Sequence, residues 1–407
     1  MITVVGIGAD GWDGLPPASR HAIATAEVLM GGARQLALVP EAPPLEAPPL
    51  DGPATGDRRP AGGGRVAGVE RVVWPSPLVP ALPGLLEAHR ARRVCVLASG
   101  DPMFHGIGTT LVRLLGADAV RVLPHPSSVS LACARLGWAL DSVAVVSLVG
   151  RPAALVVPHL HPGRRVLVLG GAAAEVAALV GDARVTVLEQ LGGPAERVHH
   201  DVAAADPLHV LAVECADGGF PLVPGLPDDA YEHDGQLTKR EVRAVVLALL
   251  APRPGELLWD VGAGSGSIAV EWSRAHPACR AIAVERDPVR AGRIARNAHA
   301  LGVPGVRVVL GESPAVLDFE PPDAVFVGGG LTADGVVERC LAALRPGGRL
   351  VANAVTVESE AVLARWHAAL GGSLTRLSVS RDTPVGGFTG WRPQMPVTVW
   401  ALTKEDQ

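Results

Sequence analysis

The sequence predicts an α/β protein made of two differently folded domains. Short aliphatic strands alternate with helical stretches along most of the 407 residues, which is typical of parallel or mixed sheets. In the second half a glycine-rich turn links the first strand to the next helix, as in a doubly wound, Rossmann-like sheet. A Gly/Pro-rich stretch at 216–229 lies between the halves. Because no simple repeat relates the halves, we expect two different folds, 1–215 and 230–407, joined by a linker.

Composition excludes several classes of protein. Hydrophobic residues make up 48% and charged residues 19% of the chain, which predicts folded cores. The net charge of -5 argues against a nucleic-acid-binding protein. The five cysteines are scattered without a C-x-x-C pair, so we expect neither disulfides nor a structural zinc site, and a reducing cytoplasm fits. No charged leader and no apolar run of the ~18 residues that span a bilayer is found, so no membrane association is expected.

The first half contains six expected strands and one segment of biased composition. Residues 2–5 predict a strand that runs into Gly6, and a helical stretch follows near 18–30. The Pro/Ala/Gly-rich segment at 41–68 has no apolar period, so we expect a flexible insertion. The other strands are expected at 94–97, 143–148, 166–169, 185–188 and 208–213.

Expected strands and helices alternate regularly in the second half. Thr238 is expected to cap a helix over 238–250, with Glu241 completing a capping box. The following strands are expected at 257–261, 281–284, 306–310 and 324–327, and helices from about 268 and over 288–300. The tail at 373–402 is expected to close the sheet with a pair of strands.

The glycine loop that follows strand 257–261 predicts a binding site. Glycines there permit positive φ and a close approach of backbone to ligand. Glu285 ends the next strand, 19 residues after Gly266, where a carboxylate can accept hydrogen bonds from both ribose hydroxyls. S-adenosylmethionine (SAM) has a ribose and an adenine but no pyrophosphate, and it suits this loop. The candidate residues are Asp260, Gly262, Ala263, Gly264, Ser265, Gly266 and Glu285.

Three further residues are candidates for the same ligand. Glu312 and Ser313 follow the next strand, where adenine would lie, so Glu312 can accept from the exocyclic amine and the Ser313 backbone can meet a ring nitrogen. Thr238 precedes the first strand and could cover the ligand, although helix capping is the stronger interpretation of this residue alone. A solvated loop residue is likewise the ordinary interpretation of Glu312.

The first half contains two weaker glycine motifs. Residues 6–11 match G-x-G-x-x-G, but Trp12 to Pro17 contain two prolines where a helix should open, so an NAD site is not expected. Residues 100–106 (GDPMFHG) follow a strand and form a turn whose backbone can hold a ligand. An ordinary Asp-Pro turn is an equally good interpretation, and His105 is kept only as a candidate for a substrate pocket.

These motifs resemble two known families. The first half is similar to the tetrapyrrole methylases, which have a two-lobed class III SAM-dependent fold, through the segments at 4–11, 99–106, 125–137 and 188–198. The second half resembles class I SAM-dependent methyltransferases through 237–244, 260–267 and 323–330. A fusion of these types resembles the decarboxylating precorrin C5,15-methyltransferase family of cobalamin biosynthesis. One departure is that the family's P-G-x-S-S reads His125, Pro126, Ser127 and Ser128 here.

The resemblance implies an activity and further site residues. The substrate is a precorrin that gains methyls at C5 and C15 and loses carbon dioxide from an acetate arm. The first half would perform the C5 methylation, and the second half the C15 methylation and decarboxylation. Two SAM sites, no metal and a homo-oligomer are expected. The first SAM site is expected at Gly8, Gly100, Asp101, Pro102, Ser127 and Ser128, and carboxylate-binding candidates are Arg381 and Arg392.

Three alternatives remain at this stage. An NAD-dependent oxidoreductase is supported only by the loop at 6–11. A class I RNA methyltransferase would share the second fold, but the acidic balance and the absence of a basic stripe argue against it. A SAM sensor without catalytic activity is the third.

Overall fold

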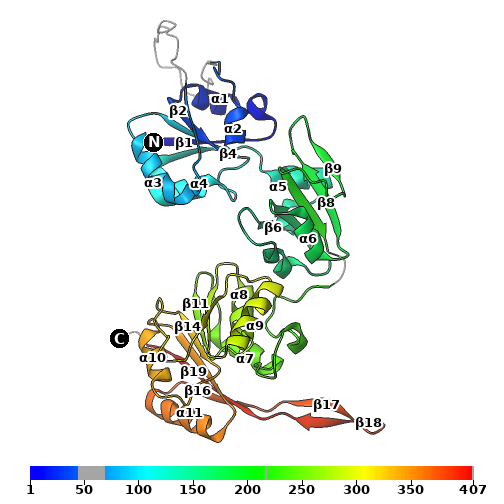
Figure 1. Ribbon diagram of the computed structural model, residues 1–407, viewed down its shortest axis with the longest axis vertical. Coiled ribbons are helices and arrows are strands. Elements are labelled where there is room, and N and C mark those ends of the chain that lie inside the picture. The colour runs from blue at the N-terminus through cyan, green and yellow to red at the C-terminus, as the bar shows by residue number, and fades with distance from the viewer. Residues whose placement is uncertain (45–68, 216–217, 406–407) are drawn as a thin grey trace. The chain divides into compact units, whose positions relative to one another are not determined.

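A computed structural model describes residues 1–44, 69–215 and 218–405. The chain forms two compact units (Figure 1). Unit 1 comprises Met1–Gly150, Arg165–Ala177 and Ala183–Glu214; unit 2 comprises Arg151–Arg164, Ala178–Asp182 and Cys215–Gln407. Most of the expected insertion at 41–68 lies outside the described residues. All five cysteines are buried and free of disulfides.

Unit 1 begins with a parallel five-stranded sheet of order β3-β2-β4-β1-β5. Its strands are nearly continuous apolar runs because helices cover both faces. The strands are β1 (Ile2–Ile7), β2 (Val28–Gly31), β3 (Glu70–Val73), β4 (Val94–Ser99) and β5 (Val120–Leu123). The helices are α1 (Pro17–Ala24), α2 (Ala33–Ala37), α3 (Leu78–Ala88) and α4 (Ile107–Leu115), with 3₁₀ turns at Gly11–Gly14 and Ala117–Ala119.

The expected helix near 18–30 is wrong in its second part. Helix α1 ends at Ala24, and Val28–Gly31 form the buried strand β2 between β3 and β4. A short apolar run such as Val-Leu-Met cannot be assigned to helix or strand by periodicity, and here the sheet determines its conformation.

A second, mixed sheet of unit 1 has the order β6-β7-β10-β8-β9. Only β6 and β7 are parallel. It contains β6 (Val143–Ser147), β7 (Arg165–Leu169), β8 (Arg184–Glu189), β9 (Arg197–His199) and β10 (His209–Glu214), with helices α5 (Ser128–Leu136) and α6 (Ala173–Val180) and a 3₁₀ turn at Leu140–Ser142. The 3₁₀ turn at Ala153–His159 and the last residues of α6 belong to unit 2. The four strands expected in this sheet are confirmed. Strand β9 was not predicted, because it is short and largely exposed and therefore has no apolar pattern.

Unit 2 contains a seven-stranded sheet of order β13-β12-β11-β14-β15-β19-β16. The chain moves outward from β11 to β13 and then restarts beside β11 with β14, so the expected doubly wound sheet is confirmed. Helices α7, α8 and α9 pack on one face, and α10 and α11 on the other. The strands are β11 (Leu257–Val261), β12 (Arg280–Glu285), β13 (Arg307–Leu310), β14 (Ala324–Val327), β15 (Arg349–Ala354), β16 (Ser373–Leu377) and β19 (Val397–Thr403). The helices are α7 (Arg240–Leu250), α8 (Ser267–Ala275), α9 (Pro288–Ala300), α10 (Val336–Ala343) and α11 (Val357–Leu370), with a 3₁₀ turn at Asp228–Ala230.

The expected capping box at the start of α7 is wrong. The helix begins at Arg240, its N-cap is Lys239, and no side chain caps it. The carbonyl oxygen of Thr238 instead accepts a 2.5 Å hydrogen bond from Nη1 of Arg243, and Glu241 pairs with Arg381. A guanidinium from the same helix therefore binds the Thr238 carbonyl, and a long-range ion pair engages Glu241.

The tail contains four strands rather than the expected pair. Strands β16 and β19 pair within the sheet, while β17 (Ser380–Val385) and β18 (Phe388–Pro393) form a separate hairpin that extends from it (Figure 1). The sequence gives no signal for the hairpin's separation, because its strands are largely exposed on both faces. No helix within the described residues has the length and apolar character needed to cross a membrane.

Candidate functional site

The glycine loop after β11 has a conformation that side chains would oppose. Gly262, Gly264 and Gly266 all have positive φ, at 69°, 60° and 77°. A Cβ on Gly262 would lie 2.6 Å from the backbone of Gly329, and one on Gly266 would lie 2.6 Å from Cγ2 of Ile294. The loop therefore packs tightly against the turn after β14 and against α9, and it leads directly into α8.

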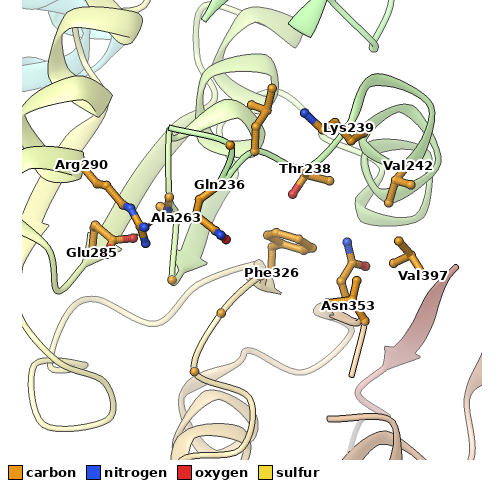
Figure 2. A pocket seen from close by; sticks show the side chains of 18 of the residues that line it. Gln236, Thr238, Lys239, Val242, Ala263, Glu285, Arg290, Phe326, Asn353 and Val397 are labelled. Carbon is orange, nitrogen blue, oxygen red and sulfur yellow. Dashed lines mark hydrogen bonds between the residues drawn. The ribbon is translucent and has the colours of Figure 1, made fainter. Parts of the chain in front are cut away.

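Glu285 connects the end of β12 to this loop. One carboxylate oxygen accepts a 2.8 Å hydrogen bond from the amide of Gly264, and the other accepts a 3.0 Å bond from the amide of Asp287. The residue is 5% exposed and lines the cavity beside the loop (Figure 2). Its position is thus fixed by the backbone before any ligand arrives.

Asp260 lies beneath the loop and does not line the cavity. Its Oδ2 accepts a 3.0 Å bond from the amide of Ala269, while Oδ1 has no partner among the described residues. Burial raises the pKa of this carboxyl to about 7, and the charge of Glu285 acts in the same direction. Asp260 therefore joins the loop to the start of α8.

The cavity of unit 2 has a volume of about 1170 Å³ and lies beyond the carboxyl ends of the central strands. Figure 2 shows Ala263, Glu285 and Arg290 on one side, and Thr238, Val242, Asn353 and Val397 on the other. Of the predicted residues, the lining contains Thr238, Gly262, Ala263, Gly264, Glu285, Glu312, Ser313, Arg381 and Arg392. Asp260, Ser265 and Gly266 lie outside it.

The rim near Glu312 is open. The Glu312 side chain is 76% exposed and is 3.9 Å from the guanidinium of Arg286. Glu312 and Ser313 follow β13, next to the strand that carries Glu285. The structure therefore brings Glu285, predicted to bind ribose, and Glu312 and Ser313, predicted to bind adenine, to one edge of the sheet.

A buried charged network fixes the 235–239 segment, which lines the cavity. The fully buried Arg243 donates from Nε to Glu271 at 2.6 Å and lies 3.3 Å from Asp228. Tyr231 donates to the same Glu271 oxygen at 2.9 Å, and burial raises the pKa of its phenol well above the ordinary value. Since Arg243 also binds the Thr238 carbonyl, the network fixes the start of α7 over the cavity.

The two predicted arginines differ in their environment. They face each other in the β17–β18 register. Arg381 pairs with Glu241 at 2.7 Å and with Asp228 at 3.3 Å. Arg392 makes no hydrogen bond or ion pair with any described residue, so its guanidinium has donors free for a ligand.

Several residues that line this cavity were not predicted from the sequence. Gln236, Lys239, Phe326, Asn353 and Gln394 line it. Gly328, Gly329 and Gly330 also line it, and their run of three glycines directly after a buried strand was the signal that could have identified them. The others come from strand ends and a loop distant in sequence, where no local pattern marks them.

Three chain segments meet in unit 1. A Cβ on Gly6 would lie 2.0 Å from the carbonyl of Gly100 and 2.7 Å from the amide of His125. Gly100 has a φ of 56°, and its own Cβ would approach Pro126 and Ser127 at 3.3 Å. The loops after β1, β4 and β5 are therefore in backbone contact.

A cavity of about 350 Å³ opens beside this junction. Gly8 lines it, as do Asp10 and His125, whose side chains lie 3.1 Å apart. No local sequence pattern marks this pair, because its members are 115 residues apart.

The other predicted residues of unit 1 lie outside that lining. Asp101 accepts from the amide of Met103 at 2.9 Å, and the Pro102 carbonyl accepts from Gly108 at 3.0 Å. Ser127 caps α5 by accepting from the amide of Ser130, and Ser128 is the first residue of that helix. His105 has a φ of 52° and packs edge-to-face on Phe104.

Comparison with known proteins decides the family. Residues 1–205 match the family of tetrapyrrole (corrin/porphyrin) methylases, and residues 229–404 match the precorrin methyltransferase domain. A protein named precorrin-6Y C(5,15)-methyltransferase [decarboxylating] from Sinorhizobium sp. is 49% identical over 99% of this chain and 96% of its own. The chain belongs to this family of decarboxylating precorrin-6Y C5,15-methyltransferases.

A second relative agrees with this assignment. A protein of the same name from Mycobacterium tuberculosis is 46% identical over 99% of this chain and all of its own. The C-terminal domain of the Rhodobacter capsulatus precorrin-6Y C5,15-methyltransferase is 45% identical, covering 45% of this chain and 100% of its own, with a TM-score of 0.43. The predicted family, fold class and enzyme class are confirmed, and the oxidoreductase and RNA methyltransferase alternatives are not favoured.

Proposed function

We propose that the chain uses SAM to methylate precorrin-6B at C5 and C15 and removes carbon dioxide from an acetate side chain. The observation that carries this proposal is the near-full-length identity to relatives that bear both activities in their name. The cavity of unit 2 supports it, because the glycine loop and a backbone-anchored Glu285 border one large opening.

We assign the C15 methylation and the decarboxylation to unit 2. The Salmonella typhimurium cobalt-precorrin-6B C(15)-methyltransferase (decarboxylating) is 32% identical, covering 90% of its own length but only 42% of this chain. A protein of half this length thus carries those two activities in its name. The match of residues 229–404 to the precorrin methyltransferase domain supports placing them here.

The residues of unit 2 suit the parts of SAM. Glu285 would accept from the ribose hydroxyls, and Glu312 and the Ser313 backbone would contact adenine. Positive φ at Gly262 and Gly264 brings backbone amides close to the amino-acid end. When bound, SAM supplies a methyl group already activated by its sulfonium, so the protein's task is alignment and exclusion of water.

The other side of the cavity suits a carboxylated macrocycle. Arg392 offers unpaired donors, and Lys239 is only loosely paired, 4.0 Å from Asp228. Phe326, Val242 and Val397 supply an apolar wall for the flat ring.

We assign the C5 methylation and a second SAM site to unit 1. The contact of Gly6 with Gly100 and His125 supports this assignment, because it gathers the loops that carry Gly8, Gly100, Asp101, Pro102, Ser127 and Ser128. His105 stays a candidate for the substrate pocket. No metal is assigned a role, and the described residues contain no cluster of His, Cys, Asp and Glu suited to hold one.

We also propose a homo-oligomer. Phe388 and Trp391 on the β17–β18 hairpin are 84% and 77% exposed, and Val385 nearby is 59% exposed. Apolar side chains gathered on a projecting hairpin are typical of an interaction surface. Five free, buried cysteines favour a reducing compartment such as the cytoplasm, and the net charge of -5 disfavours a nucleic-acid partner.

The proposal is tested by supplying methyl-labelled SAM and precorrin-6B to the full chain. Two labels gained and one carbon dioxide released per substrate are expected. A product with a single label, or two labels without carbon dioxide, would contradict the assigned reaction.

A further inference from the structure

The cavity of unit 2 has two chemically different sides. The side formed after β11, β12 and β13 carries the glycine loop, Glu285 and Ser313, which the proposed function gives to SAM. The opposite side is formed by the ends of β15 and β19, the hairpin and the 235–239 segment. Phe326 lies between the two sides (Figure 2).

Asn353 is placed on the second side by the alternation of β15. Ala352 and Ala354 are buried against α10 and α11, whereas Val351 packs on the opposite face. Residue 353 shares the face of Val351, since alternate residues of a strand point the same way. Its amide therefore emerges at the strand end into the cavity, toward the gap between Phe326 and Val397 (Figure 2).

The Asn353 amide has an unused acceptor. Its Oδ1 is buried and has no hydrogen-bond partner among the described residues. A buried acceptor without a donor destabilises a folded protein, so such a group calls for a partner that arrives with a ligand.

The surroundings of Asn353 select the kind of partner. Phe326, Val242 and Val397, which flank it in Figure 2, are apolar. Lys239 and Arg392 carry the charges offered to a ligand on this side, on the 235–239 segment and on the hairpin, so a carboxylate is expected beside them rather than beside the apolar neighbours of Asn353. A neutral N–H donor on a flat, apolar ring can hydrogen-bond to the amide oxygen of Asn353 while the ring packs against Phe326.

We propose that Oδ1 of Asn353 accepts a hydrogen bond from a pyrrole-type N–H of the tetrapyrrole. The bond fixes the rotation of the ring above Phe326 and so decides which bridge carbon faces the methyl donor. Asn353 is a specificity-determining residue that contacts the substrate. The inference rests on the assignment of C15 methylation to unit 2.

Two variants of similar size distinguish acceptor from donor. Asn353→Asp keeps an acceptor at the same position, whereas Asn353→Leu removes it. With the full chain, precorrin-6B and labelled SAM, kcat/KM for the C15 methylation is expected to fall about tenfold or more in Asn353→Leu, which is the loss of one buried hydrogen bond. Asn353→Asp should retain more activity than Asn353→Leu, while both keep the SAM affinity of unit 2 and the rate of C5 methylation.

Two outcomes would overturn the proposal. Unchanged C15 kinetics in Asn353→Leu would show that the amide does not contact the substrate. A lower activity in Asn353→Asp than in Asn353→Leu would show that Asn353 donates to a carboxylate instead. Glu285→Ala, measured in parallel, reports on the proposed function itself: if that variant spares C15 methylation, the assignment to unit 2 fails whatever the Asn353 variants do.

Discussion

The amide of Gly264 donates a 2.8 Å hydrogen bond to the carboxylate of Glu285. One side chain thus holds the glycine loop and is also the residue proposed to bind the ribose of SAM. This double role means that its loss should affect both the loop and the ligand.

Replacing Glu285 with Ala is expected to weaken SAM binding to unit 2 by about 10- to 100-fold, since hydrogen bonds to a charged group contribute ~1.5–3 kcal/mol. C15 methylation and carbon dioxide release should fall together, while C5 methylation continues. Isothermal titration and product analysis measure both effects. Glu338→Ala is the matched control, because that side chain is exposed on α10 and does not line the cavity, so affinity should not change. An equal effect of the two substitutions would contradict the role given to Glu285.

Gly264→Val is expected to abolish C15 methylation and decarboxylation without affecting the C5 methylation. Its Cβ would lie 3.0 Å from the carbonyl of Gln236, and a φ of 60° is strained for a β-branched residue. Product analysis with labelled SAM separates the two methylations. Gly305→Ala is the control, since nothing lies within 4 Å of that position. Equal loss of both methylations in a folded Gly264→Val would refute the division of labour.

Arg243→Met is expected to destabilise unit 2 by ~3–5 kcal/mol, because it leaves the buried Glu271 carboxylate without its cation. Arg381→Met should cost less than about 1 kcal/mol, since its ion pairs involve a side chain 40% exposed. Chemical denaturation of the full chain, followed by Trp fluorescence, gives both values. Comparable stability losses would contradict the central place of Arg243.

Asp260 should give unit 2 an unusual pH dependence. Burial raises the folded-state pKa to about 7 from an ordinary 3.8, so the folded state holds a proton that the unfolded state releases. The contribution of this group to the free energy of unfolding is therefore largest below about pH 4 and falls as the pH rises to about 7. The Asp260→Asn variant removes this term, so its stability relative to the parent chain should increase with pH across that window. A constant difference from pH 4 to 7 would contradict the raised pKa.

Phe388→Ser combined with Trp391→Ser is expected to lower the oligomeric mass measured by light scattering. Both side chains are exposed on the hairpin and line no described cavity, so SAM affinity should not change. An unchanged mass would exclude the hairpin as the self-association surface.

The sequence predicted the parts of this fold whose signals are local. Strand 257–261 and helix 288–300 match the structure at both ends, because a buried run and an Asp-Pro start define them. Thr238 and Glu241 formed an equally good local pattern, yet Thr238 binds Arg243 of the same helix through its carbonyl and Glu241 pairs with the distant Arg381. Most residues of the proposed substrate side could not be predicted for the same reason. Asn353 has no local sequence signal, and it becomes a candidate only because the fold places it in the cavity lining with Phe326.

The attachment of the β17–β18 hairpin has an evolutionary consequence. Leu377 and Val397 are directly paired in the sheet, so residues 378–396 leave and re-enter the fold at one point. A segment attached in this way can be lengthened, shortened or exchanged without changing the strand order of the sheet or the glycine loop after β11. Because it carries Arg381 and Arg392, this segment would allow the proposed substrate side of the cavity to change among related proteins without altering the glycine loop.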